Sequence, residues 1–188
     1  PNKSGNVGAI VCAVPFIRAK DVLQSYAGAT GLEKRQALGE AIAQHYQQLF
    51  QLAVNERQQR QLDVPIIATG HLTALGVSQS DSVRDIYIGT LDGFAAEGFP
   101  PADYIALGHI HRPQKVAKTE HIRYSGSPIP LSFDELNTEK QVVLVEFSGH
   151  NCQQITPLAV PLFQPMQVLR GDLAALATAI PEVAAAHP

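Results

Sequence analysis

The fold class follows from two stretches of sequence, Ile66-Ile-Ala-Thr-Gly-His71 and Tyr104-Ile-Ala-Leu-Gly-His-Ile-His111. Each opens with a short apolar run and contains a glycine followed directly by a histidine. Continuous apolar runs of this length are typical of strands that are buried on both faces, as in an α/β sheet. Ligand sites of such sheets lie in the crevice outside the carboxyl ends of the strands. The two stretches therefore predict strands that turn sharply at glycine and direct the following histidines into this crevice.

The flanking sequence predicts a helix on this sheet and further short strands around it. Between residue 31 and about residue 60, apolar residues recur every three or four positions among Glu, Lys and Gln, which predicts an amphipathic covering helix. The apolar positions of this helix are Leu38, Ile42, Tyr46, Leu49, Leu52 and Ala53. Strands are predicted over residues 7–14, 121–124, 141–147 and 153–158, the last three as an antiparallel meander. Residues 168–180 predict a strand that leads into a helix.

The composition is that of an ordinary soluble globular protein. Of the 188 residues, 45% are hydrophobic and 16% are charged, and the formal net charge is −3. No apolar run approaches the roughly 20 residues that a membrane-spanning helix needs. The two cysteines, Cys12 and Cys152, share no metal-ligand spacing, so we expect neither a disulfide framework nor a zinc finger. We therefore expect a reducing compartment, the cytoplasm, and no membrane partner.

Three of the seven histidines are candidates for metal binding. His71 and His109 each follow a strand that ends in glycine, and His111 lies two residues farther on. Residues two apart in extended chain project to the same side, so the imidazoles of His109 and His111 can reach one shared metal or two adjacent ones. The alternative is a histidine with no ligand role, and this alternative is preferred for the other four, which are His45, His121, His150 and His187.

The two histidine motifs resemble the last two motifs of the calcineurin-like metallophosphoesterases. Further stretches narrow the likeness to DNA-nuclease subunits of this family that work with an ATPase subunit, namely Val83–Asp92, Phe99–Tyr104 and Arg123–Glu135. The likeness extends from about residue 8 to about residue 175. It implies an α/β fold, an α+β sandwich of four layers, of which this chain holds the carboxyl-terminal part. The chain begins with Pro1 and has a single methionine, Met166, so we expect it to be a piece of a longer protein.

The resemblance also implies a function. The family member would be a DNA exonuclease and endonuclease that depends on two Mn²⁺ ions and takes part in DNA repair, recombination and replication. Two metals, roughly 3.5–4 Å apart, would clamp a phosphodiester and supply the attacking hydroxide. His71 and His109 would bind one metal and His111 the other. The protein would be a homodimer, with residues 1–164 in the nuclease domain and residues 165–188 at the start of a smaller domain that caps the DNA.

The motifs that complete the family's metal site are absent from this sequence. They are Asp-x-His, Gly-Asp-x-x-Asp and Gly-Asn-His-Asp, and they supply the bridging carboxylate and the histidine that protonates the leaving group. We therefore assign no catalytic residue within the chain and expect the chain alone to be inactive. Two alternatives stay open, another phosphodiesterase of the same superfamily and a non-enzymatic module for dimerisation or docking.

A basic cluster beside the second histidine motif is a candidate for contacts with DNA phosphates. Its members are Arg112, Lys115, Lys118 and Arg123, with only Glu120 opposing them. The alternative is a solvated hairpin. The net charge of −3 argues against broad affinity for nucleic acid, although a local patch would suffice.

Overall fold

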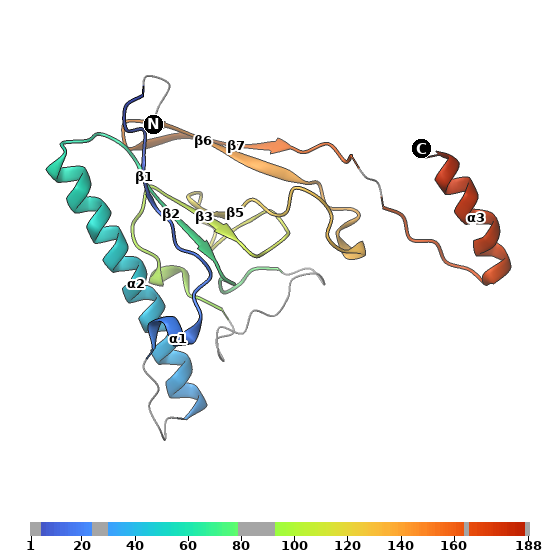
Figure 1. Cartoon of the computed structure of the whole chain (residues 1–188), viewed down its shortest axis with the longest axis horizontal. Helices are drawn as coiled ribbons and strands as arrows, with labels where there is room; N and C mark the ends of the chain where they lie inside the picture. Colours follow the sequence, from blue (N-terminus) through green and yellow to red (C-terminus); the bar gives the residue numbers. More distant parts are fainter. Residues whose placement is uncertain (1–4, 24–29, 79–92, 164–165, 187–188) are drawn as a thin grey trace.

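The structure, a computed structural model, describes residues 5–23, 30–78, 93–163 and 166–186. It has the α/β class expected, with a parallel-rich sheet, helices and a separate two-stranded hairpin (Figure 1). The strand order in the sheet is β1-β2-β3-β5-β4. The motif at residues 83–92 and the terminal His187 lie outside the described residues. The strands of the sheet are β1 (Ile10–Cys12), β2 (Ile66–His71), β3 (Tyr104–Gly108), β4 (Gln114–Lys115) and β5 (Ile122–Tyr124).

Strands β1, β2, β3 and β5 are parallel, and only β4 runs antiparallel, against β5. The two Gly-His stretches form the adjacent strands β2 and β3, as predicted, and both strands extend into their glycines. The observed β1 is shorter than the predicted strand over residues 7–14. Parallel strands end at the same edge of a sheet. In the register of β2 with β3, His71 lies directly opposite Gly108.

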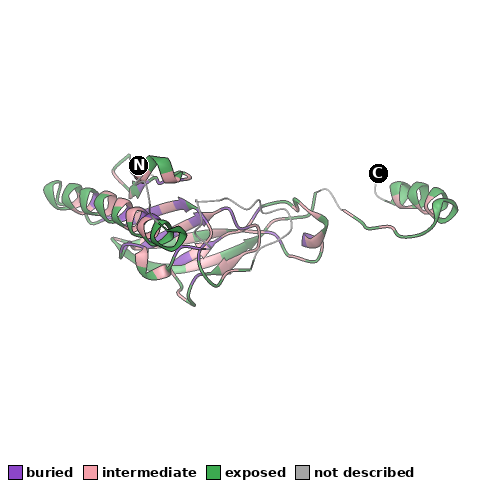
Figure 2. Ribbon diagram, turned by 90° about the horizontal axis from the view of Figure 1, so that it is seen from below, coloured by how far each residue is buried: buried purple, intermediate pink, exposed green. Residues whose placement is uncertain are grey.

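Helix α2 (Gly31–Gln59) contacts β1 and β2 and covers one face of the sheet, as its amphipathic pattern predicts (Figure 2). A short helix, α1 (Ala19–Val22), packs beside it. The side chains that α2 buries are Leu38, Ile42, Tyr46 and Ala53. Leu52, which the pattern placed in the same apolar stripe, is 64% exposed because it lies about 100° around the helix from the buried Ala53.

A capping box closes the first turn of α2. The Thr30 hydroxyl accepts a hydrogen bond from the Glu33 amide at 3.3 Å, and the Glu33 carboxylate accepts one from the Thr30 amide at 2.7 Å. This arrangement satisfies two backbone N–H groups that have no partner within the helix. The hydrogen bonds from Thr30 also hold the pKa of Glu33 below its usual value.

The predicted antiparallel meander is wrong in its first strand. Residues 121–124 join the main sheet as β5, which runs parallel to β3 with Ile122 opposite Ile105. The chain reverses direction on entering β4 and again on leaving it, so β5 returns in the direction of β3. Burial of Ile122 and Tyr124 explains why this segment lies in the sheet and not at its margin. The other two segments form the predicted antiparallel hairpin of β6 (Gln141–Ser148) and β7 (Asn151–Ala159).

The turn of the β6–β7 hairpin is anchored next to the start of β2. Asp63 accepts a hydrogen bond from the His150 amide at 3.2 Å, and its Oδ1 lies 2.8 Å from His150 Nδ1. These hydrogen bonds hold the pKa of Asp63 below its usual value. Gly149 adopts a φ of +59°, and a Cβ there would overlap the Asp63 carboxylate. His150 thus has a structural contact at this turn.

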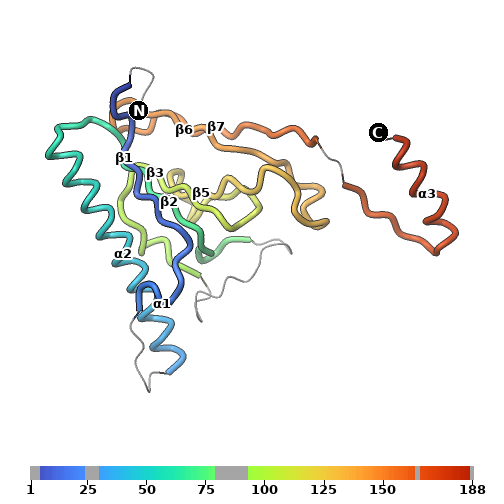
Figure 3. Tube along the Cα trace, viewed as in Figure 1, coloured from blue at the N-terminus to red at the C-terminus, as the bar shows by residue number. Residues whose placement is uncertain are grey.

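After β7 the chain leads away from the sheet to helix α3 (Leu173–Ala186), which buries none of its side chains (Figure 3). The strand predicted ahead of this helix is wrong, because residues 166–172 have no regular secondary structure. In the described part of the chain no neighbouring strand pairs with them. The domain division at residue 165 stays a prediction. None of the helices that the structure describes combines the length and apolar character needed to cross a membrane.

Gly70 allows α2 to approach β2 closely. Tyr46 of α2 is 1% exposed and donates a hydrogen bond from its hydroxyl to the Thr69 carbonyl at 3.1 Å. A Cβ on Gly70 would overlap this hydroxyl. We therefore expect Gly70→Ala to lower the free energy of unfolding, measured with urea, by about 1–3 kcal/mol through overpacking.

Tyr46→Phe supplies the control, because it removes the overlapping oxygen at the cost of one hydrogen bond. The double variant G70A/Y46F should lose less stability than the sum of the two single variants. Strictly additive losses would contradict the clash between the new methyl group and the hydroxyl.

Candidate metal centre

The structure brings His71 and His109 together at the carboxyl ends of neighbouring strands. His71 is the last residue of β2, and His109 directly follows β3. Their ring centroids are 5.4 Å apart, and the ring planes are inclined by 58°. The sequence predicted that these two histidines lie close together, because each directly follows a glycine at the end of a strand. Its role as a metal-ligand pair stays a prediction.

Residues around His71 hold its backbone and leave space for its ring. A Cβ at Gly108 would lie only 3.0 Å from His71 Nδ1, so glycine permits the ring to lie against the end of β3. Beyond His71, the buried hydroxyl of Tyr124 donates a hydrogen bond to the Leu72 carbonyl at 2.7 Å and accepts one from the Ala74 amide at 2.9 Å. The chain directly after the histidine is therefore held in place.

The electrostatic environment favours the neutral form of His71. Partial burial of the ring, with a smaller contribution from the nearby His111, lowers its pKa from the usual value. Because a lowered pKa leaves the imidazole unprotonated at neutral pH, the ring of His71 keeps a nitrogen lone pair that is free of a proton.

His109 has an unusual backbone conformation. Its φ is +95°, in the left-handed region that residues with a side chain rarely adopt, and the residue is buried. Such a conformation costs of order 1–3 kcal/mol and persists where the surrounding structure imposes it. The turn after β3 therefore places this imidazole at the edge of the sheet at a cost in backbone energy.

His111 faces a buried carboxylate. Its Nδ1 lies 3.1 Å from Oε1 of Glu135, the last residue of the short 3-10 helix η2 (Phe133–Glu135). The other oxygen of Glu135 contacts the ammonium group of Lys140. Glu135 is fully buried and Lys140 is 4% exposed. Sequence reasoning missed this ion pair, because the only visible signal was the position of Glu135 at the end of the Arg123–Glu135 motif.

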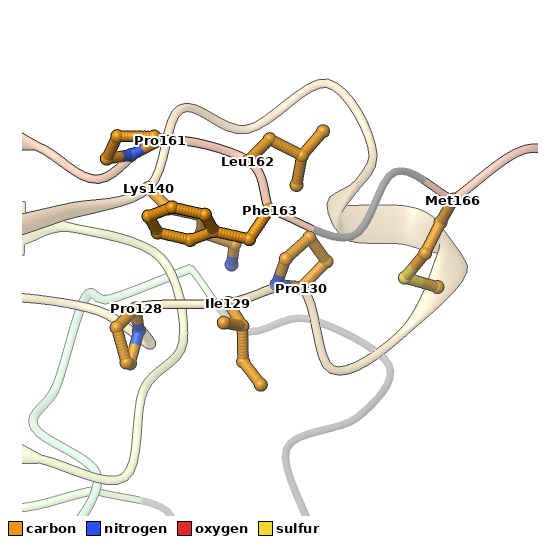
Figure 4. A pocket seen from close by; sticks show the side chains of 8 residues that line it. All are labelled: Pro128, Ile129, Pro130, Lys140, Pro161, Leu162, Phe163 and Met166. Atoms are coloured by element: carbon orange, nitrogen blue, oxygen red, sulfur yellow. The ribbon is translucent and has the colours of Figure 1, made fainter. Parts of the chain in front are cut away.

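Lys140, which contacts this carboxylate, also lines an apolar pocket of about 440 Å³ (Figure 4). Residues 128–130 and 161–163 line the pocket, together with Lys140 and Met166. The ammonium group of Lys140 also donates a hydrogen bond to the Ser127 hydroxyl at 2.9 Å. The ammonium group of Lys140 thus meets both Ser127 and Glu135 at the side of this pocket.

The three candidate histidines supply imidazole donors but no complete metal site among the residues that the structure describes. In the described residues, no group of three or more His, Cys, Asp or Glu side chains lies close enough to hold a metal ion. His71, His109 and His111 therefore do not close into one three-ligand site. Adjacent imidazoles are nonetheless suitable donors for a divalent transition metal, and they require carboxylate ligands from other residues to complete the set.

The basic cluster is largely paired with acidic side chains. Arg112 lies 3.3 Å from Asp134, while Lys115 and Arg123 both contact Glu120. Lys118 is exposed and makes no ion pair with any residue that the structure describes. The predicted DNA contacts of this cluster stay a prediction.

Comparisons with known proteins agree with the motif resemblance, although no protein-family model matches the chain. The chain is 55% identical over 176 residues to the SbcD subunit of nuclease SbcCD from Escherichia coli K12, which covers 94% of the chain and 44% of that protein. It is 34% identical over 188 residues to the SbcD subunit of Rhodobacter capsulatus, covering 98% of the chain and 44% of that protein. This stretch of sequence belongs to the SbcD family. It spans less than half of the length of these two SbcD relatives.

The strained backbone of this SbcD-family chain allows a test at His109. Glycine adopts a φ of +95° without steric cost, whereas alanine does not. We expect His109→Gly to be more stable than His109→Ala by about 1 kcal/mol, measured by urea unfolding. Since both variants lack the imidazole, the comparison isolates the backbone. Equal stability, or a more stable alanine variant, would show that residue 109 is not held in the left-handed region.

Proposed function

We propose that this chain contributes part of the two-metal centre of a Mn²⁺-dependent phosphodiesterase that cleaves DNA as an exonuclease and endonuclease. The observation that carries the proposal is the adjacent imidazole pair of His71 and His109, in a chain of the SbcD family. The protein would act as a homodimer with an SbcC-type ATPase subunit in DNA repair, recombination and replication. Its location would be the cytoplasm.

Each histidine has a defined part in this proposal. His71 and His109 would hold one Mn²⁺ ion, and His111 would hold the second. When bound, the two ions would neutralise charge on the phosphodiester and lower the pKa of the attacking water. The lowered pKa of His71 keeps its imidazole available for ligation at neutral pH. The bridging carboxylate and the proton donor would come from residues outside this sequence.

The basic cluster would contribute to binding of the DNA backbone. Arg112 is half-buried next to His111, and Lys118 is exposed on the turn between β4 and β5. Both could approach phosphates bound at the carboxyl ends of the strands. Lys115 and Arg123 both contact Glu120, which offsets one of their two positive charges.

Alanine substitution of the three histidines tests the metal centre. In a protein of full SbcD length that contains this sequence, His71→Ala, His109→Ala and His111→Ala should each lower Mn²⁺ content and reduce nuclease activity by at least about a hundredfold, the scale for loss of one strong electrostatic stabiliser. Metal analysis and a DNA cleavage assay measure both effects.

The control for this series is His45→Ala. His45 lies on α2 and not at the ends of the strands, where His71 and His109 lie. This variant should keep its Mn²⁺ content and activity. Normal cleavage and full Mn²⁺ content in the His109 and His111 variants would show that the Gly-His-x-His loop has only a structural role.

The isolated chain supplies a second test of where the ligands lie. The 188-residue chain alone, in millimolar Mn²⁺, should cleave neither duplex nor single-stranded DNA, because the sequence lacks the motifs of the bridging carboxylate and the proton donor. A sensitive fluorescent cleavage assay is suitable. Robust metal-dependent cleavage by purified chain, free of contaminating nuclease, would contradict this assignment of the ligands.

A further inference from the structure

We propose that Glu135 is a positioning residue that orients the His111 ring and presents its Nε2 to the metal centre. This inference rests on the proposed function, in which His111 binds one of the two metals. The inference gives a role to the buried carboxylate of Glu135, to which the sequence motifs assigned none. The role is carried by a direct contact between the Glu135 carboxylate and His111 Nδ1, at 3.1 Å.

The contacts of Glu135 indicate that its carboxylate is ionised and acts only as an acceptor. Its Oε2 contacts the Lys140 ammonium group and accepts a hydrogen bond from the Leu131 amide at 3.3 Å. Its Oε1 accepts a hydrogen bond from the Ser132 hydroxyl at 3.3 Å and faces the imidazole of His111. A positive charge and several donors surround the group, and these stabilise the charged form of a carboxyl.

An acceptor on Nδ1 determines the tautomer of the imidazole. A carboxylate has no proton to give, so Nδ1 of His111 carries the hydrogen and donates it. In neutral imidazole the lone pair then lies on Nε2, on the other side of the ring. This is the geometry in which an outer carboxylate orients a metal-binding histidine.

The same contacts exclude Glu135 itself as a metal ligand. Both of its oxygens are engaged by protein groups, and the residue has no exposed surface. Stability alone is a weak reason for a buried ion pair, since such pairs can often be replaced by well-packed apolar groups without loss. A role in holding the His111 ring explains why the chain buries two opposite charges at this place.

The test is Mn²⁺ binding to the full-length protein in the absence of DNA, measured by equilibrium dialysis and metal analysis. Glu135→Gln combined with Lys140→Met removes both charges and so avoids a buried unpaired ammonium group. Glu139→Gln is the matched control, because Glu139 is a neighbouring exposed carboxylate. We expect the E135Q/K140M variant to bind one Mn²⁺ like the wild type and the second about tenfold or more weakly. The E139Q variant should bind both normally.

Repeating the substitutions in a His111→Ala protein shows whether Glu135 acts through the His111 ring or through a general effect on the structure. If Glu135 acts through His111, adding E135Q/K140M to H111A should cause no further loss of Mn²⁺ affinity. Glu135→Asp, which keeps the charge but draws the carboxylate back from the ring, should weaken the same site. If circular dichroism shows that E135Q/K140M does not fold, the E135D variant is used in its place.

Two results would overturn the inference while leaving the proposed function intact. One is unchanged affinity for both ions in the folded E135Q/K140M or E135D variant. The other is an equal loss of affinity with and without the His111 ring. If H111A itself leaves Mn²⁺ binding unchanged, His111 is not a ligand, and the proposed function and the inference fail together.

Discussion

Parallel pairing of β2 with β3 is the constraint on which the candidate site depends. The register places Ile67 opposite Tyr104 and His71 opposite Gly108, so both strands end at one edge. His109 follows at once, and its ring lies 5.4 Å from that of His71. A slip of one residue would turn every side chain of the shifted strand to the opposite face of the sheet and separate the two imidazoles.

Two buried tyrosine hydroxyls stabilise this edge from neighbouring elements. Tyr46 of α2 binds the backbone just before Gly70, and Tyr124 of β5 binds the loop just after His71. Burial raises the pKa of Tyr46 well above its usual value and raises that of Tyr124 to about 12. Both hydroxyls therefore remain protonated donors at neutral pH. Helix α2 and strand β5 thus hold the chain just before and just after His71.

Glu135, Lys140 and His111 form a network of polar contacts, unlike the apolar core around these tyrosines. It places a carboxylate and an ammonium group out of water, where their attraction is strong but the cost of removing water from each is also large. The network connects the segment before β6 to the Gly-His-x-His loop through His111. Because buried ion pairs are a weak source of stability, the proposed role in fixing the direction of the His111 ring gives the network a reason that overall stability does not.

The sequence by itself determined the α/β class, the helix over residues 31–59, the strands β2 and β3, and the position of His71 and His109 after two glycines. These features depend on local patterns, because apolar runs, helical spacing and glycines act on neighbouring residues. Only the tertiary structure decided the direction of β5 and the contact between His111 and Glu135, which are 24 positions apart. Such contacts depend on how the chain folds back on itself, and no local period of the sequence encodes that path.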